Sequence, residues 1–471
     1  MFFSPSLRLG AFVVALAGLS ASAAQAESLK AALTAAYAHN PTITSALTAV
    51  KVASESIALR KAATLPTIGA TAGISDSFSS LPTLGGIANS PSASVGLGYN
   101  QTLFDNHKTD AQVEQARALV EVATQQLRST EASVLTSVVQ AYMNVILNTQ
   151  LVQLRTDTVT FYQSQVKAAQ DRQNIGEGTK IDVAQAQASL ASAVAAQKAA
   201  QASLQTAQAS YLHWVGHKPL NLSSDYNFGT LIPVTVDRAL ALADSINPAI
   251  LAAKASIRAA QAGTDAAIAA FGPSVGLSGS IGPTFTGSFG APAGTGTGGT
   301  AALAGKVGLS LSLPIYAGGA LGAAERSANL SEIKSSLDAQ AAIDQVNEAV
   351  VTAWSTLQNA SAQIESAKSA VDAGQLALQG VIQERDVGQK TTLDVLNQEA
   401  TLTTSKEALI SASANKIIAA FALIATTGKM SPHDLGLNTP TKSATAYTAE
   451  VEDTYEELHT IQPLPRPAWR R

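Results

Sequence analysis

The chain of 471 residues has no cysteine, few aromatic residues (5%) and few charged residues (14%). Without thiols there are no disulfides, no cysteine-ligated metal sites, no cysteine nucleophile and no lipid attached to cysteine. The formal net charge of −4, from 30 basic and 34 acidic side chains, gives no sign of the basic surface typical of nucleic-acid-binding proteins. This composition is unusual for a soluble enzyme and indicates an envelope protein or a helical protein rich in small residues.

The first 26 residues predict a cleaved export signal. Arg8 precedes an apolar run from Leu9 to Leu19, and Ala24-Gln25-Ala26 gives the small-x-small pattern that a signal peptidase cleaves. The run is about half as long as the ~20 residues of a membrane-spanning helix, so a retained anchor is disfavoured. We expect the mature chain to begin at Glu27 and to be periplasmic, secreted or inserted in an outer membrane as β-strands.

The remaining chain is a tandem repeat. Asn40-Pro41 recurs 207 positions later as Asn247-Pro248, whereas the turn 174–179 recurs 212 positions later as 386–391. Between these matches, Ser75–Pro91 faces the longer Gly282–Thr300; both are rich in turn-forming residues and are predicted as surface loops. Paired positions at constant spacing indicate an internal duplication. The predicted organisation is a signal peptide (1–26), a first repeat (27–230), a second repeat (231–428) and a partly disordered C-terminal tail (429–471).

Each repeat contains two segments of alternating apolar and small polar residues, within about 67–104 and 274–316. Such segments predict β-hairpins with one apolar face, as in transmembrane β-strands. A soluble two-sheet sandwich is the alternative.

Long helices occupy the rest of each repeat. The helical hairpins are predicted at about 106–215 and 321–427, and shorter helices at about 41–64 and 248–270. At ~1.5 Å per residue, each first helix would be roughly 100 Å long. Apolar residues recur every seventh position, which predicts a coiled coil; they are Val138, Val145, Val152, Val159 and Val166, matched by Val350, Leu357, Ile364, Val371 and Leu378.

Four strands cannot form a closed barrel, so the chain must form oligomers if it enters a membrane. The signal peptide, the repeated Asn-Pro, the paired strands and the Gly-x-x-Thr-x-x-Asp-Val turn of both repeats resemble the TolC family of outer-membrane exit ducts over about residues 28 to 428. The resemblance implies a mixed α and transmembrane β fold, with four strands and long coiled-coil helices per protomer. It also implies a homotrimer with a 12-stranded barrel in the outer membrane and a 12-helix periplasmic tube. An inner-membrane transporter, ABC or proton-driven, would dock there with a periplasmic adaptor protein.

The helix turns are the predicted functional site. Their tips carry Gly176 and Thr179, and Gly388 and Thr391. By the resemblance, Asp394 contributes to a ring of carboxylates in the lumen, which would favour cations. Asn397 replaces the second acid of the family's ring.

The resemblance also implies links that hold this gate shut. Lys390 would be the basic link to Asp182, and Arg385 stands where the family has an aromatic residue. The alternative is that Asp182 and Asp394 simply cap their helices.

Catalysis is not predicted. His213 and His217 would share a helical face, but no third metal ligand is near and Pro219 marks the helix end. The glycine-rich run 294–299 neither follows a buried parallel strand nor opens a helix, so it predicts an outer loop and not a phosphate site. We therefore expect a transport protein without a cofactor or a metal.

Type I protein secretion is the predicted cargo route, because the chain lacks the cysteine that lipid-anchored drug-efflux relatives carry. Multidrug or small-molecule efflux is the alternative. An exported coiled-coil scaffold or adhesin without a pore would explain the helices but neither the strands nor the duplication. Part of the C-terminal tail is expected to wrap around the middle of the tube.

Overall fold

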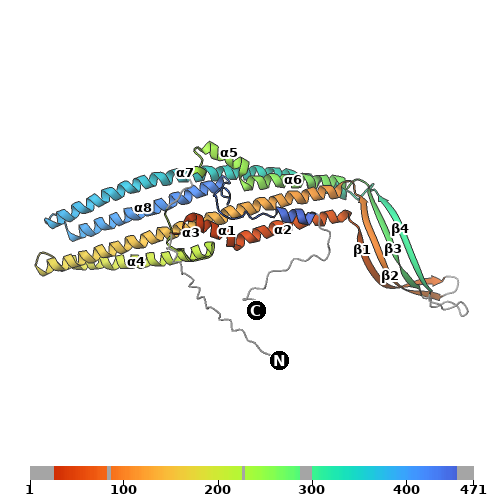
Figure 1. Cartoon of the computed structure of the whole chain (residues 1–471), viewed down its shortest axis with the longest axis horizontal. Coiled ribbons are helices and arrows are strands. Elements are labelled where there is room, and N and C mark those ends of the chain that lie inside the picture. Colours follow the sequence, from red (N-terminus) through yellow and green to blue (C-terminus); the bar gives the residue numbers. More distant parts are fainter. Residues whose placement is uncertain (1–25, 82–85, 225–228, 287–299, 453–471) are drawn as a thin grey trace, which may run out of the picture.

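A computed structural model describes residues 26–81, 86–224, 229–286 and 300–452. The described chain is elongated, with long helices forming most of its length and a β-sheet at one end (Figure 1). The predicted signal peptide up to Gln25, the run 294–299 and the tail beyond Glu452 lie outside the described residues. The mixed fold predicted from the sequence is confirmed.

The α-helices and β-strands occur in the same order in both repeats. The first repeat comprises α1 (Leu29–His39), α2 (Pro41–Lys61), a 3₁₀ turn (Ala62–Thr64), β1 (Thr67–Leu81), β2 (Gly86–Phe104), α3 (Lys108–Asn174) and α4 (Lys180–Val215). The second comprises a 3₁₀ turn (Gly229–Leu231), α5 (Val236–Ile246), α6 (Pro248–Ala269), β3 (Ser274–Thr286), β4 (Thr300–Ser312), α7 (Ala320–Asp386) and α8 (Thr392–Thr426). A last short helix, α9 (Thr445–Glu452), follows them.

The repeated Asn-Pro has the same structural role in both halves. Asn40 Oδ1 accepts a hydrogen bond from the backbone N–H of Thr42 at 2.9 Å and caps α2. The equivalent Asn247 Oδ1 accepts from Ala249 at 2.8 Å and caps α6. Proline fits the position after each cap because the first turn of a helix needs no N–H there. The asparagine amide groups also donate to the ends of the returning helices, Asn40 to Trp214 O at 3.5 Å and Asn247 to Thr426 O at 2.8 Å.

The sheet is antiparallel with strand order β1-β2-β3-β4. The pairing of β1 with β2 runs without a break from Thr67 opposite Asn100 to Leu81 opposite Gly86. The prediction that Ser75–Pro91 and Gly282–Thr300 are loops throughout is therefore wrong. In the first segment, strand pairing continues to Leu81 of β1 opposite Gly86 of β2. In the second, it continues to Thr286 of β3 opposite Thr300 of β4. Their serine and glycine content suggested loops, but the backbone hydrogen bonds of a ladder do not depend on side-chain type.

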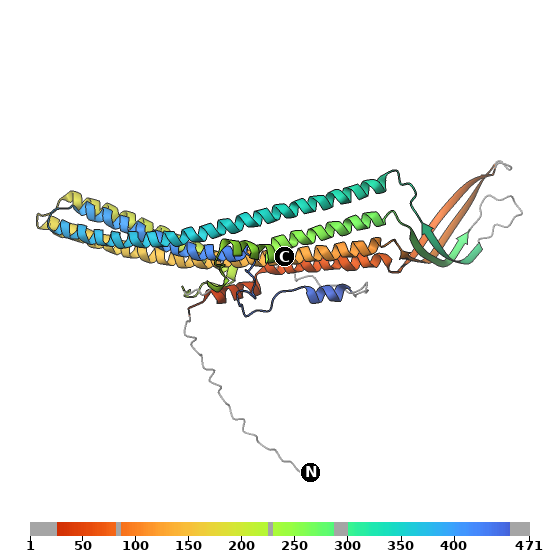
Figure 2. The same ribbon diagram turned by 90° about the horizontal axis from the view of Figure 1, so that it is seen from above.

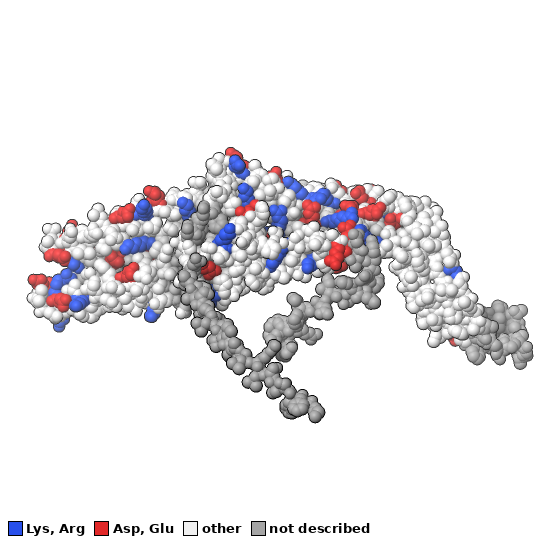
Figure 3. All heavy atoms as spheres, viewed as in Figure 1, with Lys and Arg blue, Asp and Glu red and all other residues white. Residues whose placement is uncertain are grey.

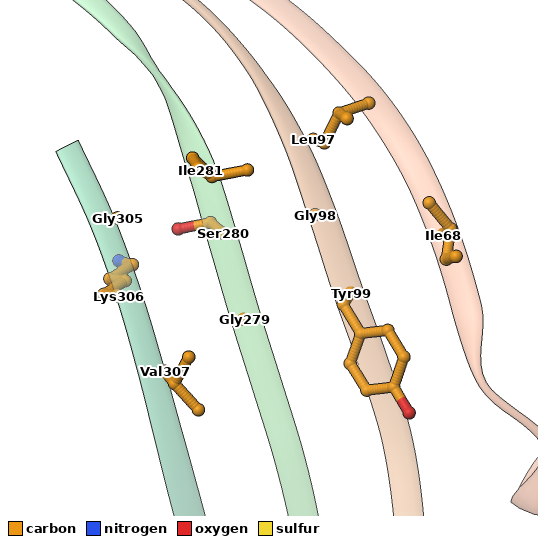
Figure 4. A pocket seen from close by; sticks show the side chains of 10 residues that line it. All are labelled: Ile68, Leu97, Gly98, Tyr99, Gly279, Ser280, Ile281, Gly305, Lys306 and Val307. Carbon is orange, nitrogen blue, oxygen red and sulfur yellow. The ribbon is translucent and has the colours of Figure 1, made fainter. Parts of the chain in front are cut away.

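One face of the sheet is apolar across all four strands. Directly opposed residues share a face, and Ile68 pairs with Tyr99, Leu97 with Ile281, and Leu277 with Leu309. Figure 4 shows Leu97 and Tyr99 on β2 and Ile281 on the neighbouring strand β3. Most of these side chains are exposed in a single chain. The sheet carries few charges, in contrast to the helical body (Figure 3). The only charged residues in the described strands are Asp76 and Lys306.

The long helices pack along the predicted seam. Val138, Val145 and Val159 of α3 are buried, as are Val350, Leu357 and Leu378 of α7. Helix α3 contacts α4, α6 and α8, and α7 contacts α6 and α8, so the two hairpins lie against each other. Two stretches, Val236–Ala269 and α8, have the length and hydropathy of membrane helices. The first is broken by Asn247-Pro248, and α8 packs against α7 and α3.

The junctions between sheet and long helix contain two consecutive residues with left-handed backbone. Asn106 and His107 have φ of 56° and 64°, and Gly318 and Gly319, 212 positions later, have φ of 61° and 85°. The first junction is held by side chains, because Asn106 Nδ2 donates to Ala269 O at 3.1 Å. The second consists of glycines with no neighbouring atom where a Cβ would lie.

The described part of the tail packs against the first repeat. The Lys442 backbone N–H donates to the Tyr37 hydroxyl at 2.8 Å, and this hydroxyl donates to the buried Glu131 at 2.8 Å. Helix α9 lies alongside α2 (Figure 2), where Glu452 pairs with Lys61 at 2.9 Å and with Arg117. The described part of the tail thus packs against the helices at the middle of the molecule.

Candidate functional site at the helix turns

The two helix turns lie together at the end of the molecule opposite the sheet (Figure 1). Both reverse the chain with the same backbone. Gly176 and Gly388 have φ of 83° and 81°, a conformation that favours glycine. The next residues, Glu177 and Gln389, each donate to a carbonyl five residues back at 2.9 Å. This motif closes the ends of α3 and α7.

Each returning helix begins with a capping box. The Thr391 N–H and hydroxyl donate to Asp394 Oδ2, each at 2.8 Å, and the Asp394 N–H donates to Thr391 Oγ1 at 3.2 Å. Thr179 and Asp182 repeat this arrangement at 2.9, 2.7 and 3.2 Å. The capping role considered from the sequence is therefore present in both repeats.

Both aspartates are held as carboxylates. The pKa of Asp394 is lowered by the backbone and side-chain hydrogen bonds from Thr391 and, more weakly, by the charge of Lys390. The pKa of Asp182 is lowered by the side-chain and backbone hydrogen bonds from Thr179, with a smaller contribution from Arg172. Hydrogen bonds to an ionised carboxyl favour the ionised form. Asp394 is partly exposed and Asn397 is exposed beside it, so each turn presents a fixed negative charge.

Lys390 is exposed and acts electrostatically on Asp394 of its own turn. In the described part of one chain, no hydrogen bond or ion pair joins Lys390 to Asp182, whose nearby cation is Arg172. The predicted Lys390–Asp182 link stays a prediction.

Two arginines connect the hairpins at this end. Arg385 Nη1 donates to Gln165 Oε1 of α3 at 2.7 Å, and its Nε and Nη2 donate to Asp386 Oδ1 at 3.0 and 2.8 Å. The Arg385 side chain is only 11% exposed. In the opposite direction, Arg172 Nη2 of α3 donates to Thr392 Oγ1 of α8 at 3.3 Å. Arg385 therefore links α7 to α3 in place of the expected aromatic residue.

Sequence reasoning missed a row of polar contacts between α3 and α8 behind the turns. Tyr162 donates its hydroxyl to Leu396 O at 3.3 Å, the Thr158 and Thr403 hydroxyls are 3.3 Å apart, and Arg155 pairs with Glu407 at 2.5 Å.

Glu399 lies in the same row and is only 8% exposed. Burial raises its pKa, against smaller lowering effects of Lys406 and a hydrogen bond from Thr403. The sequence does indicate that Glu399 is buried, because it lies three residues after Leu396 and three before Leu402, on the same face of α8.

The comparisons with known proteins agree with this geometry. The model of the outer membrane efflux protein family matches residues 32–216 and 239–429, one match for each repeat. The chain is 34% identical to the outer membrane efflux protein BepC of Brucella suis, over 97% of this chain and 98% of that protein. It is 26% identical to the outer membrane protein TolC of Escherichia coli, over 90% and 86%. It is 25% identical to the alkaline protease secretion protein AprF of Pseudomonas aeruginosa, over 65% and 63%.

The fold has a solved counterpart in the outer membrane protein VceC of Vibrio cholerae, with a TM-score of 0.69 and 24% identity over 85% of this chain and 96% of that one. Long paired helices carrying a four-stranded sheet define an outer-membrane channel protein of the TolC type. The chain belongs to the outer membrane efflux protein family. The predicted resemblance, internal repeat and outer-membrane location are confirmed.

Proposed function

We propose that three copies of this chain form a continuous duct from the periplasm through the outer membrane. The observation that carries the proposal is the open four-stranded sheet, in which β1 and β4 each leave one edge unpaired within the described residues of a single chain. Unpaired edges in lipid are costly, and closure with other copies satisfies them. Three sheets supply twelve strands, with the apolar face toward lipid and the small polar face toward water.

The helical end would form the periplasmic entrance, with Asp394 and Asn397 at its constriction. Three capped, ionised Asp394 side chains near one axis would favour cations over anions. Lys390 and Asp182 would link neighbouring hairpins once the copies assemble. An inner-membrane transporter and its periplasmic adaptor would dock at this end and supply the energy, because the proposed duct carries out no reaction.

Of the two transport routes, we propose small-molecule efflux first, on the similarity to BepC. The efflux protein BepC is 34% identical over nearly the whole chain, whereas the secretion protein AprF is 25% identical over 65% of it. Type I protein secretion, predicted from the absence of cysteine, remains the second candidate, with AprF in its favour. Absence of cysteine removes a lipid anchor but places no restriction on what passes through the lumen.

Ion conductance of the purified protein in a planar lipid bilayer tests the duct. We expect a small, cation-preferring conductance whose preference falls in Asp394→Asn. Asparagine keeps an acceptor for the Thr391 N–H and removes only the charge. Asp244→Asn, in α5 and away from the turns, is the matched control. No conductance from a correctly inserted oligomer would refute the duct, and unchanged selectivity in Asp394→Asn would refute the carboxylate ring.

The gate link is tested by reversing its charges. Lys390→Glu should raise conductance by repelling Asp182, and the double variant Lys390→Glu with Asp182→Lys should restore the closed state. Additive effects of the two substitutions would show that the side chains do not interact.

The cargo is tested in a deletion strain. Increased susceptibility to small toxic compounds, restored by the intact gene, supports efflux. Loss of particular proteins from the culture medium with unchanged susceptibility supports secretion in its place.

A further inference from the structure

Glu27, the first residue after the predicted cleavage site, is enclosed by the chain at the middle of the molecule. Its backbone N–H faces two carbonyl oxygens, Asn221 O at 3.0 Å and Leu220 O at 3.4 Å. Its carbonyl oxygen accepts from the Ser223 N–H at 2.9 Å and from the Tyr142 hydroxyl at 2.7 Å. The backbone of Glu27 is therefore fixed between α3 and the segment that follows α4.

Among the described residues, only one of the two carboxylate oxygens of Glu27 has a hydrogen-bond donor. Oε1 accepts from the Tyr211 hydroxyl at 2.8 Å and lies 3.4 Å from His217 Nε2. Oε2 is buried and has no hydrogen-bond partner in the described part of the chain. The whole side chain is 11% exposed. A buried carboxylate oxygen without a partner is costly, so this arrangement calls for a further donor or positive charge.

The surplus of acceptors matches an ammonium group better than an amide. In the uncleaved chain the Glu27 nitrogen carries one proton but faces two carbonyl oxygens. Hydrolysis of the Ala26–Glu27 bond adds the oxygen of one water molecule to the Ala26 carbonyl carbon, which leaves as a carboxylate. The Glu27 nitrogen becomes an ammonium group with three protons. These suffice for both carbonyl oxygens and for the carboxylate, and the positive charge compensates the buried negative charge.

We propose that the carbonyl oxygens of Leu220 and Asn221 and the Glu27 carboxylate form a binding socket for the chain's own mature α-ammonium group. Tyr142 and Tyr211 hold the carbonyl and the carboxylate of Glu27 in place. The socket is complete only after signal peptidase has cleaved between Ala26 and Glu27. Removal of the signal then does more than release the chain from the inner membrane. It fastens the new N-terminus between α3 and α4, so that the cleaved chain is more stable in its folded form than the precursor.

Within the described residues, the titratable side chains in contact with Glu27 are Tyr142, Tyr211 and His217. Burial and the neighbouring Glu27 raise the pKa of Tyr211, so its hydroxyl stays protonated and remains a donor. His217 Nε2 is the other nitrogen beside the carboxylate, 3.4 Å from Oε1. Its ring lies beside Oε1, so Oε2, which has no hydrogen-bond partner among the described residues, is the oxygen that the proposed ammonium group would pair with.

The experiment measures acetylation of the α-amine in the mature protein purified from outer membranes. Peptide mass spectrometry should first give Glu27 as the N-terminal residue. Acetic anhydride at low concentration should then acetylate the α-amine at least tenfold more slowly in the folded protein than in denatured chains. Its rate should rise with pH to a midpoint above the ordinary α-amine pKa of about 8. Burial without pairing would lower the pKa instead, so the direction of the shift separates a socket from simple enclosure.

Two variants separate charge from packing. Glu27→Leu keeps the bulk and removes the carboxylate, and should move the midpoint below about 8. Tyr211→Phe removes a hydrogen bond to the same carboxylate but keeps its charge, and should leave the midpoint raised. A different N-terminal residue, a midpoint at or below the ordinary value in the unaltered protein, or equal effects of the two variants would overturn the proposal.

Discussion

Arg385 at the end of α7 donates to the buried Gln165 near the end of α3, with Nη1 and Oε1 2.7 Å apart. Gln165 is itself 9% exposed, so the bond satisfies a side chain that water reaches poorly. The two helical hairpins, which derive from different repeats, are thereby tied close to their turns.

Loss of this tie should loosen the turn of the second hairpin. Arg385→Ala leaves Gln165 buried without its donor, at a cost of about 1 to 2 kcal/mol. Amide hydrogen exchange in residues 386–391 should accelerate by about tenfold, while exchange in the sheet stays unchanged. Arg326→Ala, an exposed arginine on the same helix, is the matched control. Equal exchange in both variants would show that the tie does not hold the turn.

The selectivity of the duct should resist acid. The pKa of Asp394 is lowered by its bonds to Thr391, so its charge and its capping contribution are complete above the ordinary aspartate pKa of about 3.9. Both are lost only as the pH falls through the lowered pKa. Cation preference measured from pH 8 down to pH 2 should remain constant to about pH 4 and fall only below it. Asp394→Asn should lack the acid transition; a transition of the same size in that variant would assign it to another carboxylate.

Glu399→Gln should stabilise the protein at alkaline but not at acid pH. Burial raises the pKa of Glu399, so the folded state holds this proton more tightly than the unfolded state. Below the ordinary glutamate pKa of about 4.3 both states are protonated and there is no penalty. The penalty grows as the pH rises to the raised pKa and is constant above it.

Thermal unfolding at pH 4 and pH 8 measures the difference. Glu399→Gln should raise the midpoint at pH 8, with a gain of about 1 kcal/mol, and leave it unchanged at pH 4. Glu365→Gln, an exposed glutamate of α7, should change neither. A gain of the same size at both pH values would assign the effect to packing.

Lys306 should oppose the cation preference set at the turns. It pairs with Ser280 on the small polar face of the sheet, which faces the lumen in the proposed barrel. Lys306→Gln and Lys306→Glu should raise the cation-to-anion permeability ratio in graded steps, the second by roughly twofold or more. Reversal potentials in a salt gradient measure this ratio. An unchanged ratio in both variants would place Lys306 outside the conduction path.

The local features of this molecule could be predicted from the sequence. The seven-residue spacing of Val138, Val145 and Val159 requires only helical geometry, and Thr391 three residues before Asp394 is sufficient for a capping box. The partners of Arg385 and Tyr162 could not be predicted, because they depend on which faces of two separate hairpins meet. The extent of β1 beyond Ser75 was missed for a related reason: its serines gain their structure from pairing with Ser92 and its neighbours.

The two joints between sheet and long helix share a backbone conformation but differ in their side chains. Both copies need left-handed backbone, but Asn106 and His107 restrict it with side chains and a hydrogen bond to Ala269 O, whereas Gly318 and Gly319 have no side chain that could do so. Glycine pairs populate many backbone conformations at similar energy. Side chains thus restrict the backbone where the first hairpin joins the sheet, whereas the second hairpin joins it through two glycines. The two repeats therefore attach the same kind of helical hairpin to the sheet with a different degree of backbone restriction at the joint.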